Sequence, residues 1–117
     1  MFMIKPLKEA IEESYTKIRE LEIAQLYASC YKTAWETTLS LEEDGKSYVF
    51  TGDIHAMWLR DSAMQLLPYL SMADIDVVAR ALRGVVLQQA HFIQIDPMPT
   101  RSTESPMAAA FAQITRK

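Results

Sequence analysis

Hydrophobic residues recur at helical spacing through the first third of the chain. After Pro6, which suits the first turn of a helix, apolar side chains follow at intervals of three, four and seven residues, and charged side chains fill the opposite face. The pattern predicts either one long bent helix or, as we prefer, two amphipathic helices with a break near residues 20–22. The apolar positions are Leu7, Ile11, Ile18, Leu21, Leu26, Tyr27, Tyr31 and Trp35. We expect the second helix over about Glu22–Trp35.

A turn signal interrupts this pattern. Residues 42–46 read Glu-Glu-Asp-Gly-Lys, with Asp-Gly at the centre, and residues favourable to β structure flank them in Thr37–Leu41 and Ser47–Thr51. The sequence therefore predicts a short β-hairpin before residue 51.

The helical period returns at Trp58. Asp61 or Ser62 is expected to cap a helix that carries an apolar series, and Pro68 is expected to kink that helix or end it early. The apolar series is Met64, Leu67 and Leu70.

Two acids, Asp74 and Asp76, indicate the start of another helix. We expect this helix to place Arg80 and Arg83 outside and to end at Asp96-Pro97, because the residue before a proline is disfavoured in the α conformation. The face predicted to be buried is Ile75, Val78, Leu82, Val85, Val86, Gln89 and Ile93.

Periodicity is lost after Pro97. Residues 98–117 are rich in Pro, Ser and Thr and are expected to be disordered. The organised part of the chain is thus mainly α. Its helices are compatible with a small bundle or with the first hairpins of a larger helical array.

Composition and charge limit the kinds of partner and the cellular location that we expect. The chain has 117 residues, is 50% hydrophobic and carries a formal net charge of −3 without a run of Lys or Arg, so we expect neither nucleic acid nor a membrane as a partner. The single cysteine, Cys30, allows no internal disulfide and is expected to pack as a small apolar residue. The first residues lack the apolar core of a signal peptide, so a cytoplasmic location is the default expectation.

The segment Thr51–Ser62, TGDIHAMWLRDS, concentrates the candidate chemistry. An indole face such as that of Trp58 stacks on a sugar ring, the Arg60 guanidinium donates from a rigid fork, and the Asp61 carboxylate accepts from hydroxyl groups. Asp53 is expected to add an acceptor or a brace for Arg60, and His55 is of the one residue type whose ordinary pKa is close to neutrality. Together these residues indicate a carbohydrate site.

A structural interpretation competes with this one. Trp58 alone is more often a core residue, Arg60 and Asp61 more often form a local ion pair of little energetic value, and Gly52-Asp53 is also ordinary turn chemistry. The sequence holds no Cys/His set with zinc spacing, no glycine-rich phosphate loop and no nucleophile elbow. We therefore predict no metal and no cofactor.

The string TGDIHAMWLRDSAMQLLPYL resembles the signature of glycoside hydrolase family 125, and the resemblance covers about residues 20–97. It implies an exo-α-1,6-mannosidase on an (α/α)6 barrel that works with inversion and without a metal, through one carboxylic acid and one carboxylate base. It also implies that Asp53, Trp58, Arg60 and Asp61 bind the terminal mannose of an α-mannoside or mannose-terminated glycan. The family's acid and base lie beyond residue 117, so no catalytic residue is assigned in this chain.

Residues 1–97 are accordingly predicted to form the first helices of the barrel, with the β-hairpin before TGDI. The family continues after Asp96-Pro97 as YANAFN-x-EPNG-x-G, whereas this chain continues as MPTRSTESPMAAAFAQITRK. Back-translated one base out of register, the chain can read YANAFNREP(H/N)GRGF, so we hypothesise that residues 98–117 are a frameshifted tail. Such a product is expected to be inactive and to aggregate or self-associate through apolar faces. The alternative is a self-standing helical binding module without enzymatic activity.

Overall fold

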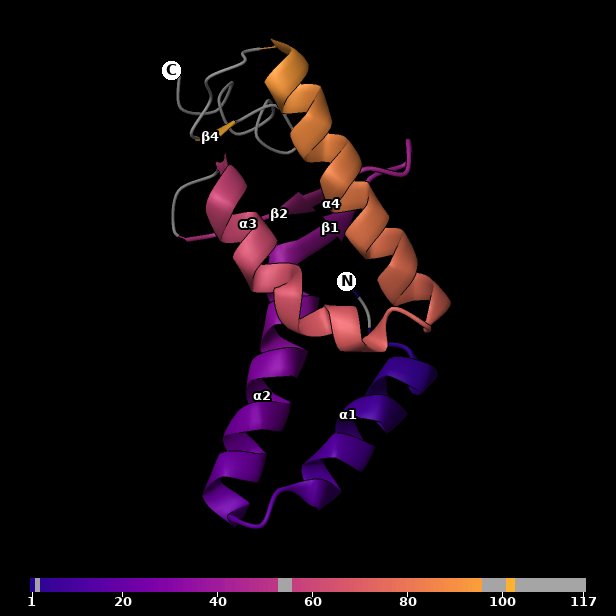
Figure 1. Cartoon of the computed structure of the whole chain (residues 1–117), viewed down its shortest axis with the longest axis vertical. Helices are drawn as coiled ribbons and strands as arrows, with labels where there is room; N and C mark the ends of the chain where they lie inside the picture. Colours follow the sequence, from indigo (N-terminus) through magenta and orange to yellow (C-terminus); the bar gives the residue numbers. More distant parts are fainter. Residues whose placement is uncertain (2, 53–55, 96–100, 103–117) are drawn as a thin grey trace, which may run out of the picture.

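A computed structural model describes residues 1, 3–52, 56–95 and 101–102. The described part is mainly helical and contains a small two-stranded antiparallel sheet (Figure 1). Its elements are α1 (Lys5–Lys17), α2 (Leu21–Thr38), β1 (Leu39–Leu41), β2 (Ser47–Val49), β3 (Met57–Trp58), α3 (Leu59–Leu66), the 3-10 helix η1 (Leu67–Met72), α4 (Asp76–Ile95) and β4 (Arg101–Ser102).

The molecule is elongated, with extents of 49 × 29 × 24 Å. Helices α1 and α2 form an antiparallel hairpin that projects from one end, whereas α3, η1 and α4 gather around the β1–β2 sheet at the other end (Figure 1). The buried core draws side chains from α1, α2, the β1–β2 sheet, β3, α3, η1 and α4. Its largest fully buried side chains include Trp35, Tyr48, Tyr69 and Phe92.

A break between the first two helices is confirmed, but it lies at residues 18–20 rather than 20–22. Lys17 ends α1, and Leu21 begins α2. The predicted apolar face is only partly buried: Leu7, Ile11 and Trp35 are in the core, whereas Leu21 and Leu26 are 62% and 64% exposed. Cys30 is also exposed, so the expectation that it packs as a small apolar residue is wrong.

Helix α2 runs further than predicted. We expected an extended segment from Thr37, but Thr37 and Thr38 lie in the last turn of the helix. Their hydroxyl groups donate to main-chain oxygens one turn back, those of Thr33 and Ala34 respectively. These local bonds satisfy both hydroxyl groups within the helix.

The β-hairpin is confirmed. Strands β1 and β2 pair antiparallel with Leu39 opposite Val49 and Leu41 opposite Ser47. The amide of Gly45 donates to the carbonyl of Glu42 at 3.1 Å, and Gly45 has φ of +82°, a conformation that glycine adopts without steric cost.

The start of α3 differs from the prediction. The helix begins at Leu59 with Trp58 as its N-cap residue, so neither Asp61 nor Ser62 caps it. Asp61 instead lies in the first turn, where a carboxylate interacts favourably with the helix dipole. Pro68 has the expected effect, because α3 ends at Leu66 and the chain continues as a 3-10 helix.

Helix α4 has the predicted extent, but the face that is buried differs from the face predicted to be buried. Of the positions expected to be buried, Val78 and Val85 are in the core, whereas Val86 and Ile93 are 65% and 47% exposed. The helix is apolar on more than one side, so its neighbours rather than its own period decide which side is covered. Its buried residues are Val77, Val78, Ala81, Gly84, Val85, Gln88 and Phe92.

Two tyrosines join α2 to η1. The Tyr69 hydroxyl donates to the carbonyl of Tyr31 at 2.5 Å, and the Tyr31 hydroxyl donates to the carbonyl of Pro68 at 3.1 Å. Their rings meet edge to face at 5.1 Å between centroids, and Trp35 lies 5.3 Å from Tyr69. Burial raises the pKa of the Tyr69 hydroxyl.

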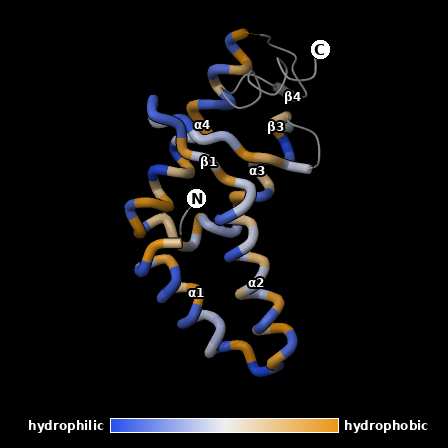
Figure 2. The backbone as a smooth tube through the Cα atoms, turned by 180° about the vertical axis from the view of Figure 1, so that it is seen from behind, coloured by the Kyte–Doolittle hydropathy of each residue, from blue (hydrophilic) through white to orange (hydrophobic). Residues whose placement is uncertain are grey.

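Several large apolar side chains remain in contact with solvent. In Figure 2 hydrophobic stretches reach the free end of the α1–α2 hairpin and recur along α4. The exposed large hydrophobic residues include Leu21, Ile23, Leu26, Met64, Leu67, Leu70, Val86, Leu87, Ile93 and Ile95. The apolar series predicted for α3 and η1 is therefore on the surface.

The segment after Pro97 is described only at Arg101–Ser102, which forms strand β4 and pairs antiparallel with β3. The rest of residues 98–117 lies outside the described part, so its disorder and its shifted reading frame stay predictions. No described helix combines the length and the apolar character required to cross a membrane.

Candidate functional site

The junction between β3 and α3 carries three of the four predicted sugar-binding residues. Trp58 ends β3, and Arg60 and Asp61 lie in the first turn of α3. The structure therefore gathers these three at one end of one helix. Asp53, together with His55, lies outside the described residues.

Trp58 is held from its N-terminal side by a buried strand. Met57, its neighbour in β3, is 0% exposed and forms a main-chain hydrogen bond with the hydroxyl of Tyr48 in β2. Burial raises the pKa of Tyr48 to about 12, and the bond to Met57 acts in the opposite direction. The Trp58 side chain is half-buried, so it is neither a core residue nor fully free in solvent.

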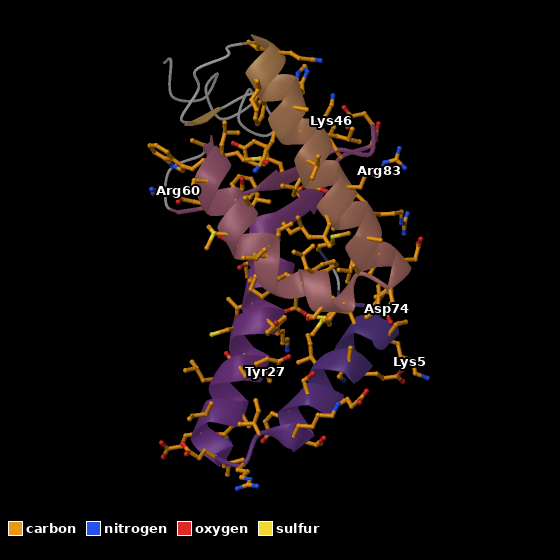
Figure 3. All side chains as sticks on the ribbon, viewed as in Figure 1. Lys5, Tyr27, Lys46, Arg60, Asp74 and Arg83 are labelled. Atoms are coloured by element: carbon orange, nitrogen blue, oxygen red, sulfur yellow. The ribbon has the colours of Figure 1, made fainter. Side chains whose placement is uncertain are left out.

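Arg60 and Asp61 form a local ion pair. The Arg60 Nε donates to Asp61 Oδ1 at 3.2 Å, with the side chains 88% and 43% exposed. Arg60 points away from the body of the molecule (Figure 3). A pair this exposed contributes little to stability. It does leave the remaining N–H groups of the guanidinium available to donate and the second carboxylate oxygen available to accept.

A polar cluster beneath these residues links α3 to α4. The Gln89 side-chain nitrogen, Nε2, donates to the carbonyl of Leu59 at 2.9 Å and to the hydroxyl of Ser62 at 3.0 Å. The Ser62 hydroxyl is buried and itself donates to Leu59 at 3.0 Å. The turn that presents Arg60 and Asp61 is thus bonded to another helix from below.

A second polar contact ties the same helix to α2. The Gln65 Nε2 donates to the hydroxyl of Thr38 at 2.5 Å, across 27 residues of sequence. Helix α3 is therefore fixed on two sides by glutamine amides, one of its own and one from α4.

Two clefts lie elsewhere on the described surface. One, of about 350 Å³, runs between α1 and α2 and is lined by Met3, Lys8, Ile11, Glu12, Ala28, Lys32 and Glu36. The other, of about 370 Å³, lies between the hairpin turn and α4 and is lined by Leu41, Glu42, Glu43, Asp44, Gly45, Arg80, Arg83 and Leu87. Neither includes the β3–α3 junction.

The second cleft has mixed charge. Arg83 and Lys46 lie on the side of the molecule opposite Arg60 (Figure 3). Burial, with the carboxylates of Asp44 and Glu43 nearby, raises the pKa of Glu42. Among the described residues no three His, Cys, Asp or Glu side chains are grouped so as to hold a metal ion.

Sequence reasoning missed the residues that support the site. The sequence predicts a cap role for Ser62, a place on an apolar face for Gln89 and a place in a strand for Tyr48. The family resemblance includes all three positions, but it assigns no contact to any of them. The contacts of Gln89 with Ser62 span 27 residues, and no local pattern indicates them.

The chain matches known proteins over most of its length. The profile of a family described as metal-independent alpha-mannosidase (GH125) matches residues 20–113. The meiotically up-regulated gene 157 protein of Schizosaccharomyces pombe is 33% identical over 97 residues, an alignment that covers 79% of this chain.

A solved structure supports the same assignment. A metal-independent alpha-mannosidase of Streptococcus pneumoniae, described as a non-productive complex with alpha-1,6-mannobiose, superposes with a TM-score of 0.76 at 33% identity over 85% of this chain. The chain spans 24% of that protein and 19% of the yeast relative. The chain belongs to the GH125 family of metal-independent alpha-mannosidases.

Proposed function

We propose that this chain supplies one wall of the terminal-mannose subsite of an exo-α-1,6-mannosidase. The single observation that carries the proposal is the presentation of Trp58, Arg60 and Asp61 together at the β3–α3 junction. The indole offers a face to the apolar side of a mannose ring, and the ion pair offers donors and an acceptor to its hydroxyls. Asp53, five residues before Trp58 in sequence, is proposed to join this group.

The relatives support the choice of sugar. The streptococcal protein is described with alpha-1,6-mannobiose, a disaccharide that ends in mannose. An inverting glycosidase needs a carboxylic acid and a carboxylate base on either side of the scissile bond. We assign neither role within this chain, so the proposed contribution is binding rather than cleavage.

The exposed apolar side chains fit the same proposal. In an (α/α)6 barrel each helix packs against several neighbours, and the chain spans only a quarter of the streptococcal relative. We propose that further helices of such a domain cover positions such as Leu67, Leu70 and Val86, which are 50%, 55% and 65% exposed here. Without that cover, the same positions are expected to drive self-association.

Titration of the ¹⁵N-labelled chain with α-1,6-mannobiose tests the proposal. The indole N–H signal of Trp58, assigned with Trp58→Phe, should shift with millimolar affinity, because one wall of a subsite provides only part of the binding energy. Isomaltose, the α-1,6-linked glucose disaccharide, serves as the control sugar.

Arg60→Met and Asp61→Asn should each abolish the shift. The proposal is contradicted if the Trp58 indole signal does not shift with mannobiose. It is also contradicted if the signal shifts equally with isomaltose. Transfer of residues 20–95 into the streptococcal relative provides a second arm, in which cleavage of mannobiose should depend on Arg60 and Asp61. The proposed frameshift is tested separately by resequencing the nucleotides around the Pro97 codon.

A further inference from the structure

We propose that Gln89 is a positioning residue that fixes the first turn of α3 and so sets the direction in which Trp58, Arg60 and Asp61 are presented. The effect on sugar binding rests on the proposed function. The effect on the first turn of α3 does not. Gln89 lies in α4, 30 residues from Leu59 in sequence, yet its side chain reaches the main chain of Leu59 directly.

The start of α3 has no cap of its own. Its N-cap residue is Trp58, and within the described part of the chain no side-chain hydrogen bond caps the helix there. An uncapped helix end frays, because its first N–H groups lack partners. The helix also has only eight residues, so its own propensity contributes little to holding the turn. The order of this turn must come from contacts with the rest of the molecule.

Gln89 provides these contacts with a matched geometry. A primary amide carries two N–H groups, and Nε2 of Gln89 lies 2.9 Å from the Leu59 carbonyl and 3.0 Å from the Ser62 hydroxyl. The Leu59 carbonyl only accepts, which requires the amide nitrogen rather than the amide oxygen on this side. The Ser62 hydroxyl in turn donates a hydrogen bond to the Leu59 carbonyl oxygen at 3.0 Å, so that Gln89, Ser62 and Leu59 form one polar cluster.

The cluster brackets the sugar-facing residues in sequence. Leu59 and Ser62 are the bonded positions, and Arg60 and Asp61 lie between them. Ser62 is 0% exposed, whereas the Arg60 side chain is 88% exposed. The same turn therefore has an inner side held by Gln89 and an outer side open to a ligand. Removal of the two amide donors leaves the buried Ser62 oxygen without its donor and releases the turn.

Amide hydrogen exchange in the full chain tests the positioning role without any sugar. Gln89→Leu keeps the side chain's approximate size and removes both donors, and it should speed the exchange of the Leu59–Ala63 amides about tenfold. Exchange in the β1–β2 hairpin should stay within about twofold of the unsubstituted chain. Gln94→Leu is the matched control, because Gln94 is an exposed glutamine of the same helix.

A pH profile separates positioning from simple packing. Gln89→Glu donates only while the introduced carboxyl is protonated, so protection of the Leu59–Ala63 amides should be restored on acidification and lost on alkalinisation. Gln94→Glu should show no such dependence. Uniform loss of protection in Gln89→Leu throughout the chain, or a Gln89→Glu profile that is flat with pH, overturns the proposal.

The mannobiose titration forms the last arm. If the unsubstituted chain shifts the Trp58 indole signal, Gln89→Leu should weaken that response about tenfold while Gln94→Leu leaves it unchanged. An unchanged response in Gln89→Leu overturns the link between the cluster and binding. If the unsubstituted chain gives no response, the proposed function fails, and the exchange and pH arms still decide the positioning role.

Discussion

Gly84 of α4 lies directly against Ser47 of β2. A Cβ atom placed on Gly84 would stand 2.2 Å from the Ser47 Oγ and 2.8 Å from both the Ser47 amide nitrogen and the Gly45 carbonyl oxygen. Ser47 is completely buried, so neither residue has space to retreat. The close approach of helix and hairpin depends on the missing side chain.

Gly84→Ala is therefore expected to destabilise the fold although alanine favours helices. The added methyl group meets main-chain atoms of β2 and the turn, and such overpacking costs about 1–3 kcal/mol of unfolding free energy. Urea denaturation measures the change. Gly52→Ala is the control, because nothing lies within 4 Å of a Cβ placed there. Equal stability of the two variants would falsify the packing argument.

Tyr48 is expected to make the fold sensitive to alkali. Burial raises its pKa from 10.0 to about 12. The folded state thus holds the phenolic proton more tightly than the unfolded state does. The contribution of Tyr48 to the free energy of unfolding is fully present below pH 10 and is lost as the pH rises from 10 to about 12.

Tyr48→Phe should weaken this alkaline loss of unfolding free energy, as followed by urea denaturation between pH 9 and pH 12. Tyr15→Phe, at a half-buried tyrosine of α1, is the comparison. If the two variants lose stability along the same curve as the unsubstituted chain, Tyr48 is not the group responsible.

The two tyrosines between α2 and η1 are expected to differ in energetic importance. Tyr69 is 2% exposed and donates to a main-chain oxygen at 2.5 Å, whereas the bond from Tyr31 is solvent-exposed. Tyr69→Phe should cost about 1 kcal/mol of unfolding free energy, because a part-buried acceptor loses its partner, and Tyr31→Phe should cost less. Denaturation midpoints of the two variants measure the order, and the reverse order contradicts the prediction.

The helices and the hairpin were predictable from the sequence because their signals are local. The break before Leu21, the Asp-Gly turn and the effect of Pro68 each depend on a few neighbouring residues. The buried faces were not predictable in the same way. Helix α4 carries apolar residues on several sides, and the packing of β2 against Gly84 decides which side is covered. Thr37 and Thr38 are helical despite their low helix propensity, and their hydroxyl groups are bonded to main-chain oxygens one turn back.

The site shows the same division. Trp58, Arg60 and Asp61 are neighbours in sequence, so any helix that starts near them brings them together. Their support comes from Gln89 and Tyr48, which belong to distant segments. The sequence therefore indicates the outward-facing residues but not the supporting ones, because only the fold brings Gln89 and Tyr48 into contact with the β3–α3 junction.

Exposed apolar residues on α3 and η1 are expected to cause self-association. Met64, Leu67 and Leu70 are 61%, 50% and 55% exposed. Leu67→Lys should reduce association in sedimentation velocity over a range of concentrations, because it removes the central apolar side chain of the three. Its unfolding free energy should change by no more than about 0.5 kcal/mol, as expected for a surface substitution.

Ala63→Lys is the matched control for this experiment. It adds the same charge at an exposed position of α3 and leaves the three apolar side chains in place. Both substitutions move the net charge from −3 toward zero, which by itself favours association. A gain in solubility with Leu67→Lys therefore comes from the lost apolar surface rather than from charge. Equal behaviour of the two variants would mean that association uses another part of the surface.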